Sequence, residues 1–237
     1  MTKVSGEQLA GEQMHGICEG TTLEVAREIV EFYETTGVVP VLLPGGGNFV
    51  RGRDAGATTA VERAEADYDG MEGTVTNAQA LTEAIREVGH KAICLVNVMP
   101  ALLSPEHRVL PTYDRRIARD SVRQGVIPVV GGGNGRPYSS TDYASVVVGG
   151  ETGCMRIMKG TNVDGVYDKD PRVNPDAICF DSLTFDQVIT EGLNVMEPTA
   201  WVVARELEMP VTVYNMLQAG NLLKAFRGEI GTRVEAT

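Results

Sequence analysis

Short apolar runs, rich in valine, alternate along the chain with segments of helical periodicity. Runs of this length that are apolar throughout are typical of strands buried on both faces of a parallel sheet. They occupy residues 38–43, 92–96, 126–130, 155–158 and 211–214. Strands that alternate with helices in this way predict an α/β fold with a mostly parallel sheet.

The first helical segment has both a start signal and a stop signal. Thr21 and Glu24 have the spacing of a capping box, in which each side chain accepts a backbone N–H of the other residue. The apolar positions from Leu23 to Tyr33 then repeat at helical spacing, and Gly37 follows as a stop. These signals predict a helix that begins near Thr21 and ends at Gly37.

Three further helices are predicted from periodicity and capping. Apolar residues recur at helical spacing over residues 71–88, which indicates an amphipathic helix. Thr184 and Gln187 form a second capping-box pattern before a short helix near residues 185–191. Pro198 suits the first turn of another helix, because proline lacks the N–H that this turn leaves unpaired.

No change of composition and no Ser/Pro-rich linker divides the chain, so a single domain over residues 1–237 is expected. The 43% of hydrophobic residues are enough for a sizeable core and exclude a disordered or fibrous chain. Residues 104–111, with two prolines, are expected to form an exposed loop or lid.

Charge and cysteine usage narrow the partners. The chain has 21 basic and 32 acidic residues, a net charge of −11, so it offers no positive field to a nucleic acid backbone. Four cysteines without a CxxC pair are typical of a reducing compartment. Neither an apolar leader nor a run near the ~18 residues of a membrane span occurs, which predicts a cytoplasmic protein with no membrane partner.

A glycine-rich device occurs twice. Residues 37–48 and 125–134 are each an apolar strand that runs into consecutive glycines and an asparagine. Glycines let backbone N–H groups converge on an anion, and parallel strands end at the same edge of a sheet, where α/β proteins bind ligands. The pair therefore favours phosphate binding, although glycines that only form tight turns remain an alternative.

Known nucleotide and hydrolase motifs are missing. The sequence has no GxxxxGK[ST] or GxGxxG, no HExxH, and no GxSxG, which disfavours P-loop, dinucleotide, zinc and acyl-transfer enzymes. Candidate cations for a phosphate are Lys3, Arg51 and Lys159, and candidate acids are Asp67, Asp142, Asp164 and Asp170. Phosphoryl transfer fits this set, since it requires positioning and charge neutralisation more than a dedicated base.

Three ordered motifs carry a resemblance to a known family. Residues 3–12, 44–52 and 159–171 together resemble bacterial UMP kinases of the amino acid kinase superfamily, with further matches at 66–71, 140–142 and 194–197. The resemblance implies a three-layer αβα sandwich with a mostly parallel central sheet. It also implies Mg²⁺-dependent transfer of the ATP γ-phosphoryl group to UMP in pyrimidine nucleotide biosynthesis, and a homohexamer.

The resemblance also assigns residues. Lys3 and Asp142 would be catalytic, and no protein side chain is assigned to a metal. The ATP-binding residues would be Lys3, Val4, Ser5, Gly6, Gly47, Arg51, Thr161, Asn162, Tyr167 and Asp170. The UMP-binding residues would be Gly46, Asp67, Asn134, Gly135, Arg136, Pro137, Tyr138, Ser139, Ser140 and Thr141, with Asp67 at the ribose hydroxyls.

Departures from the family pattern keep two alternatives open. Asn134 and Arg136 stand where the family typically has threonine and asparagine, which favours a related kinase for another small acceptor. Only two residues precede Lys3, where the family has a longer first strand, and a frayed Lys3 would favour a nucleotide-binding protein without catalysis. Glu197 replaces the family's usual aspartate, at a position associated with the acceptor pocket or feedback.

Overall fold

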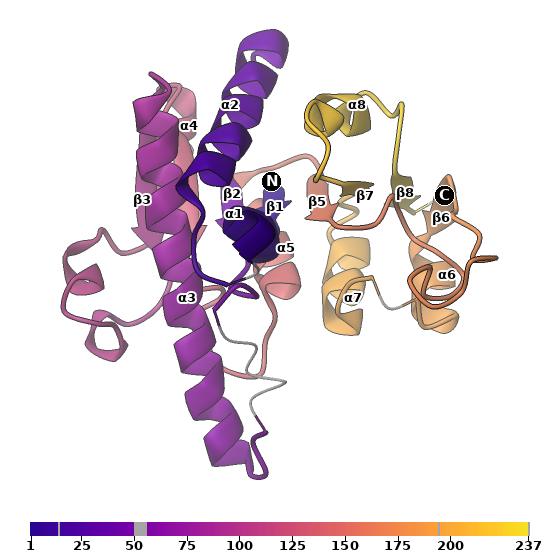
Figure 1. Cartoon of the computed structure of the whole chain (residues 1–237), viewed down its shortest axis with the longest axis horizontal. Helices are drawn as coiled ribbons and strands as arrows, with labels where there is room; N and C mark the ends of the chain where they lie inside the picture. Colours follow the sequence, from indigo (N-terminus) through magenta and orange to yellow (C-terminus); the bar gives the residue numbers. More distant parts are fainter. Residues whose placement is uncertain (14, 50–55, 194, 237) are drawn as a thin grey trace. The chain divides into compact units, whose positions relative to one another are not determined.

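The structure of the chain is a computed structural model, shown in Figure 1. It describes residues 1–13, 15–49, 56–193 and 195–236. The chain divides into two compact units, here called the C-terminal unit (Met1–Lys3 and Asp142–Thr237) and the N-terminal unit (Val4–Thr141). The expected single domain over residues 1–237 stays a prediction.

The sheet of the C-terminal unit contains five strands. These are β1 (Thr2–Val4, of which Val4 belongs to the other unit), β5 (Ile157–Thr161), β7 (Val211–Asn215), β8 (Thr232–Glu235) and β6 (Ser182–Thr184). Their order is β1-β5-β7-β8-β6. The β1/β5, β5/β7 and β8/β6 pairs are parallel, and the β7/β8 pair is antiparallel.

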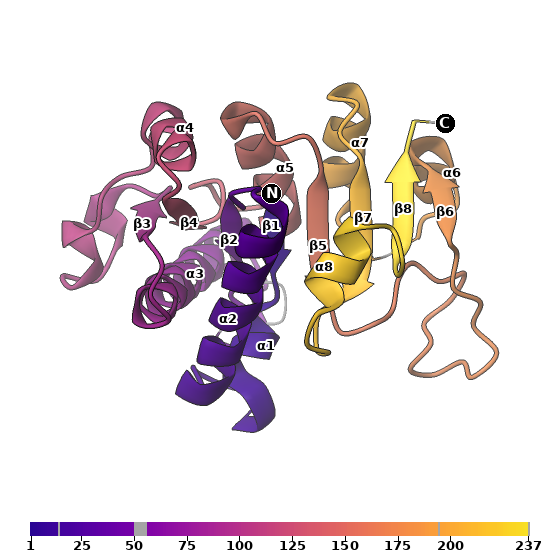
Figure 2. The same ribbon diagram turned by 90° about the horizontal axis from the view of Figure 1, so that it is seen from above.

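Helices cover both faces of this sheet. They are α5 (Thr141–Thr152), α6 (Phe185–Thr190), α7 (Pro198–Glu206) and α8 (Asn221–Phe226). Figure 2 shows α5 and α7 on one face of the strands and α8 on the other. The unit therefore has a helix-sheet-helix layering of its own.

The N-terminal unit repeats this layering. Its strands are β2 (Leu42–Pro44), β3 (Ala92–Val96) and β4 (Ile127–Gly131), in the order β3-β4-β2 and all parallel. Its helices are α1 (Gly6–Ala10), α2 (Glu19–Thr36), α3 (Ala60–Glu87) and α4 (Arg115–Arg123), with the 3-10 turns η1 (Gly11–Gln13), η3 (Pro100–Leu102) and η4 (His107–Val109). Figure 2 shows α3 and α4 on opposite faces of β3 and β4.

The predicted fold class is confirmed. Within the two units the strand orders are β3-β4-β2 and β1-β5-β7-β8-β6. Of the strand pairs that the described residues form within the units, β7/β8 is antiparallel and the others are parallel, so the strands are mostly parallel, as their alternation with helices predicted. The helices on both faces supply the two outer layers of the αβα arrangement.

The ends of two elements differ from the predictions because a local feature of the chain sets where each element begins. β2 begins only at Leu42, because Pro40 cannot donate to the ladder and Val38 is exposed. The predicted cap at Thr21 is wrong: α2 begins at Glu19, with Cys18 as its N-cap, and the Cys18 N–H donates to the Leu9 carbonyl.

The long helix α3 starts eleven residues before the predicted residue 71, at Ala60. Its start is a capping box made by Thr59 and Glu62, and both hydrogen bonds of the box are present. Periodicity misses this first part because it is exposed and polar. The caps at Thr184 and Pro198 are confirmed by α6 and α7.

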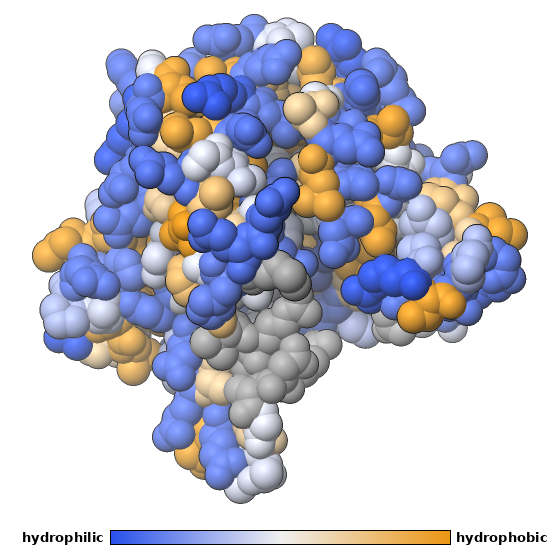
Figure 3. All heavy atoms as spheres, viewed as in Figure 1, coloured by the Kyte–Doolittle hydropathy of each residue, from blue (hydrophilic) through white to orange (hydrophobic). Residues whose placement is uncertain are grey.

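The apolar strands form the buried core. Leu42, Leu95, Ile127 and Ile157 have no exposed surface. On the face of the molecule drawn in Figure 3, hydrophilic residues cover most of the surface and apolar residues form small separate groups. Burial of the valine-rich runs therefore supplies the main driving force for folding.

Candidate active site

Two lysine side chains and one aspartate side chain meet inside the C-terminal unit. The Nζ atom of Lys159 lies 2.5 Å from Oδ1 of Asp142, and Nζ of Lys3 lies 3.7 Å from the same oxygen. Only 14% of the Lys3 side chain, 15% of Asp142 and 7% of Lys159 are exposed. Two ammonium groups thus share one buried carboxylate.

Strand register brings the cluster together. β1 and β5 are parallel, and Lys3 is the register partner of Lys159, so the two side chains emerge next to each other. Asp142 lies in the first turn of α5, where the helix dipole favours an acidic residue. Lys3 is held in a paired strand, which removes the structural reason for expecting it to be frayed.

The two lysines decide the ionisation of Asp142. Burial by itself would raise the pKa of Asp142, but the charges of Lys159 and Lys3 outweigh burial and hold that pKa below its ordinary value. Burial lowers the pKa of Lys159 to about 8, against the opposing attraction of Asp142. The cluster therefore carries a permanent carboxylate and one lysine whose proton is weakly held.

Lys159 belongs to this cluster, although the family motifs assign it no role. The sequence suggests it only as one of three candidate cations for a phosphate. The apolar run that predicted the strand at residues 155–158 stopped just before it, whereas β5 continues to Thr161. The sequence signal that points to this residue is a lysine in the middle of a buried strand, because a buried lysine needs a charged partner.

A cavity of about 410 Å³ opens in the same unit. Its lining comes from the end of β5 and the segment that follows it, and from Glu191, Gly192, Leu193 and Val195. All four residues predicted to surround an adenosine line it, namely Thr161, Asn162, Tyr167 and Asp170. Asp170 is fixed by Arg172, whose Nη2 lies 2.8 Å from Oδ2 of Asp170.

The first glycine loop lies in the N-terminal unit, after β2. The Gly45 N–H donates to the Val4 carbonyl over 2.9 Å, and the Phe49 N–H donates to the Gly46 carbonyl over 3.0 Å. A Cβ added to Gly6 would lie 2.6 Å from the Gly45 carbonyl oxygen, so only glycine allows this approach. The structure thus brings Val4 and Gly6 next to Gly45, at the start of the first glycine loop.

The second glycine loop is fastened to α3. The Gly132 N–H donates to Thr74 Oγ1 over 2.7 Å, and Asn97 Nδ2 donates to the Gly133 carbonyl over 2.9 Å. The Asn134 side chain accepts the Arg136 N–H over 3.0 Å, which closes a local turn. Backbone groups and neutral side chains hold this first part of the loop.

Asp67 meets the loop further on. Its Oδ2 accepts the Tyr138 N–H over 2.7 Å, and its Oδ1 accepts Arg63 Nε over 2.8 Å. The Tyr138 hydroxyl donates to the Ala60 carbonyl over 2.6 Å, and the Tyr138 φ of 63° is rare for a residue with a side chain. The Oγ of Ser139 is buried without a hydrogen-bond partner among the described residues.

The predicted site residues therefore fall into two groups. The C-terminal unit holds Lys3, Asp142, Thr161, Asn162, Tyr167 and Asp170. The N-terminal unit holds Val4, Ser5, Gly6, Gly46, Gly47, Asp67, Asn134, Gly135, Arg136, Pro137, Tyr138, Ser139, Ser140 and Thr141. Arg51, predicted to bind ATP, lies outside the described residues.

The described part of the chain contains no group of three His, Cys, Asp or Glu side chains that could hold a metal ion. The Asp142 carboxylate, a suitable magnesium ligand by its chemistry, is paired with Lys159 and Lys3. A magnesium ion would fit here as a companion of nucleotide phosphates, not in a cage of protein ligands.

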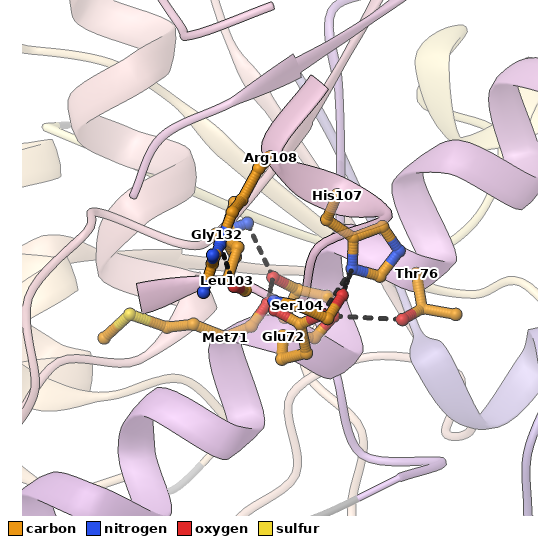
Figure 4. A network of polar contacts seen from close by, with 9 residues as sticks. Met71, Glu72, Thr76, Leu103, Ser104, His107, Arg108 and Gly132 are labelled. Carbon is orange, nitrogen blue, oxygen red and sulfur yellow. Dashed lines mark hydrogen bonds and ion pairs between the residues drawn. The ribbon is translucent and has the colours of Figure 1, made fainter. Parts of the chain in front are cut away.

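A serine, a histidine and a glutamate also meet in the N-terminal unit, between α3 and η4 (Figure 4). His107 Nδ1 lies 2.5 Å from Oε1 of Glu72 and 3.2 Å from Oγ of Ser104. Both partners use the same ring nitrogen, whereas a nucleophilic triad needs the two nitrogens separately. The cluster instead fastens the segment predicted as a loop or lid, and His107 is buried.

No helix in the described ranges is both long enough and apolar enough to cross a membrane.

The chain belongs to the amino acid kinase family, which it matches over residues 2–215. Its relatives in that family include uridylate kinases. It is 39% identical over 240 residues to the uridylate kinase of Oenococcus oeni, with 100% of this chain and 96% of that protein covered. It is 37% identical over 236 residues to the uridylate kinase of Xanthomonas euvesicatoria, with 99% and 95% covered.

Solved structures give the same result. The UMP kinase of Bacillus anthracis superposes with a TM-score of 0.88 at 27% identity, covering 99% of this chain and 94% of that one. The UMP kinase of Ureaplasma parvum superposes with a TM-score of 0.86 at 26% identity, covering 99% and 97%. The resemblance to bacterial UMP kinases is confirmed.

Proposed function

We propose that this chain is a UMP kinase, which transfers the γ-phosphoryl group of ATP to UMP and yields UDP and ADP. The observation that carries the proposal is the buried Lys3–Asp142–Lys159 cluster in a chain whose full-length relatives are uridylate kinases. No observation favours the two alternatives, another acceptor or a protein without catalysis.

The lysine pair provides the charge that the reaction needs. In the transfer, the bond between the γ-phosphorus and the β,γ-bridging oxygen of ATP breaks, and a bond from a UMP phosphate oxygen to that phosphorus forms. Lys3 and Lys159 neutralise negative charge on the transferring group and on the leaving ADP. Asp142 keeps the two ammonium groups charged and aimed, and it takes no part in the bonds that change.

Donor recognition belongs to the cavity of the C-terminal unit. Thr161, Asn162, Tyr167 and Asp170 surround the adenosine there. The ATP phosphates are bound by Lys3, by the backbone of Val4, Ser5, Gly6 and Gly47, and by Arg51. A backbone free of side chains suits this task, because several N–H groups can point to one anion.

Acceptor recognition belongs to the N-terminal unit. Gly46 and the segment from Asn134 to Thr141 bind UMP, and Asp67 accepts the ribose hydroxyls. Two features support this role: the Asp67 carboxylate is fixed on both oxygens, and Ser139 Oγ is buried without a partner in the described part of the chain.

Magnesium, assembly and location complete the proposal. Mg²⁺ enters as a complex with ATP and adds positive charge at the phosphates. The protein is a cytoplasmic homohexamer that serves pyrimidine nucleotide biosynthesis and uses neither a nucleic acid nor a membrane. Sedimentation velocity of the purified chain tests the hexamer, which a monomer or dimer at micromolar concentration would contradict.

Release of ADP tests the activity. The purified chain is incubated with Mg-ATP and UMP, dUMP, CMP, AMP or GMP, beside a control without acceptor. We expect fast turnover with UMP and formation of UDP. Faster turnover with another monophosphate would replace the proposed acceptor, and stabilisation by ATP without ADP release would indicate a binding protein.

A further inference from the structure

Two fully buried asparagines face each other beneath the first glycine loop. Asn48 is 1% exposed and Asn77, on α3, is 0% exposed. Asn48 Nδ2 donates to Asn77 Oδ1 over 3.0 Å, and Asn77 Nδ2 donates to Asn48 Oδ1 over 2.7 Å. The two amides thus form a closed reciprocal pair, called here the Asn48–Asn77 pair.

The remaining donors of the pair reach backbone carbonyls. Asn48 Nδ2 also donates to the Gly16 carbonyl over 2.6 Å, and Asn77 Nδ2 donates to the Gly45 carbonyl over 2.7 Å. An asparagine amide has two N–H donors, so all four donors of the pair are satisfied. A buried polar network that is complete in this way specifies one arrangement, because any other leaves a polar group unpaired.

The first glycine loop, next to the pair, has a backbone with few conformational restrictions of its own. Residues 45–47 are all glycine, which has the largest backbone freedom of any residue. Asn77 fixes the Gly45 carbonyl, while the Gly45 N–H is bound to Val4. A Cβ on Gly6 would also lie 2.6 Å from Asn48 Oδ1, so the backbone at the start of α1 rests directly on the pair.

We propose that Asn77 is a positioning residue for phosphoryl transfer, which acts through Asn48 and Gly45 to hold the first glycine loop and the start of α1 in one geometry. Asn77 touches no nucleotide in this account. The inference rests on the proposed function, since it assigns the loop to the ATP and UMP phosphates. Its physical basis is that misplacing a reacting group by about 1 Å can cost on the order of 100-fold in rate.

The test compares Asn77→Ala with Thr82→Ala in the full-length chain. Thr82 is a buried polar residue of the same helix, 1% exposed. Its hydroxyl donates to the Ala78 carbonyl over 2.7 Å and is a hydrogen-bond partner of the Cys94 side chain. Thr82→Ala therefore removes a buried hydrogen bond without touching the loop. Both variants are assayed at a temperature where thermal unfolding shows them fully folded.

We expect Asn77→Ala to lower kcat for UDP formation by about 10- to 100-fold, because the loop loses its geometry. The KM values for ATP and UMP should change less than about threefold, and Thr82→Ala should keep the kcat of the wild type. A kcat of Asn77→Ala within about twofold of the wild type, or an equal loss in both variants, would overturn the proposal.

Hydrogen exchange supplies a readout that needs no activity. The amides of residues 45–49 should exchange faster in Asn77→Ala than in the wild type. Their exchange rates should be unchanged in Thr82→Ala. Asn77→Asp, which keeps the side-chain shape but removes both donors, should behave like Asn77→Ala. If the wild type makes no UDP, the proposed function fails while faster exchange still supports the loop-holding role; unchanged exchange in both Asn77 variants overturns it.

Discussion

The C-terminal unit gathers full charges, whereas the N-terminal unit presents backbone groups and neutral amides. In the first, two lysines lie 2.5 and 3.7 Å from one carboxylate oxygen. In the second, the glycine loops are held by Thr74, Asn77 and Asn97, and one carboxylate, Asp67, is already paired. The difference indicates a division of labour between charge neutralisation and positioning.

This division has a physical reason. Charges inside a protein act strongly on a developing charge, but burying them costs stability unless they are paired. Backbone N–H groups and amides hold geometry at lower desolvation cost. Substitutions in the charged cluster of the C-terminal unit should therefore lower kcat most, and substitutions of the side chains proposed to contact UMP in the N-terminal unit should alter acceptor binding.

The largest effect is expected for Asp142→Ala. It leaves two like charges without their carboxylate, and breaking a buried pair costs about 3–5 kcal/mol of stability. We expect kcat to fall on the order of 10²- to 10³-fold, measured as UDP formation beside a urea unfolding curve. Asp186→Asn is the control, since Asp186 pairs with Arg205 at the surface. Equal activity in both variants would refute the role of Asp142.

The pH profile should show the lowered pKa of Lys159, about 8. If Lys159 acts as an ammonium, kcat/KM falls as pH rises through this value. The Lys159→Arg variant keeps its positive charge at pH 8, so its kcat/KM, whatever its size, should not fall as pH rises through that value. The free energy of unfolding moves the other way. Burial of the charged Lys159 destabilises the folded protein at low pH, and this cost is relieved as pH rises from about 8 to the ordinary lysine pKa of 10.5, so stability rises through that window. An identical alkaline fall in both proteins would contradict this assignment.

Asp67→Asn tests the acceptor half of the comparison. The change removes the charge that Arg63 and the Tyr138 N–H contact. We expect the KM for UMP to rise about tenfold, equivalent to about 1.4 kcal/mol, with a smaller change in kcat. The neighbouring exposed residue provides the control, Asp69→Asn, whose kinetics should match the wild type. A loss confined to kcat would assign Asp67 to chemistry instead of binding.

The smallest effect is expected for Glu72→Gln, because Glu72 belongs to neither of the two groups of predicted site residues. Burial would raise the pKa of Glu72, but hydrogen bonds from Ser104 and His107 lower it below its usual 4.5. Its stabilising contribution is thus complete above pH 4.5 and lost as pH falls through the lower folded-state value. We expect a loss of about 1–2 kcal/mol at neutral pH by thermal unfolding, and a smaller one in acid. Glu83→Gln, at an exposed position of α3, is the control; equal losses in the two variants would contradict the prediction.

The apolar pattern predicts the strands well because burial decides them. β3 matches residues 92–96 as predicted, β4 is shifted by one residue at each end, and β7 is one residue longer than predicted. The failures have local causes: Pro40 shortens β2, and the polar first part of α3 carries no apolar periodicity. Thr59 and Glu62 are the capping signal that could have placed that helix start.

The site is predictable only in part. Motifs identify Lys3, Asp142 and four residues that line the cavity, but the pairing of Lys3 with Lys159 depends on the register of β1 against β5. The Asn48–Asn77 pair joins residues 29 positions apart, which no local pattern links. Contacts of this kind follow from tertiary packing, and only the structure supplies them.

A single-turnover measurement on Lys3→Met tests the division of labour most directly. Enzyme in excess of labelled ATP is mixed with UMP, the reaction is quenched at successive times, and the UDP formed is quantified. The affinities for both nucleotides are measured separately by calorimetry. The account predicts that transfer slows by on the order of 100-fold while the affinity for UMP changes less than about threefold. Transfer at the rate of the wild type, or an equal loss of transfer and of UMP binding, would contradict it.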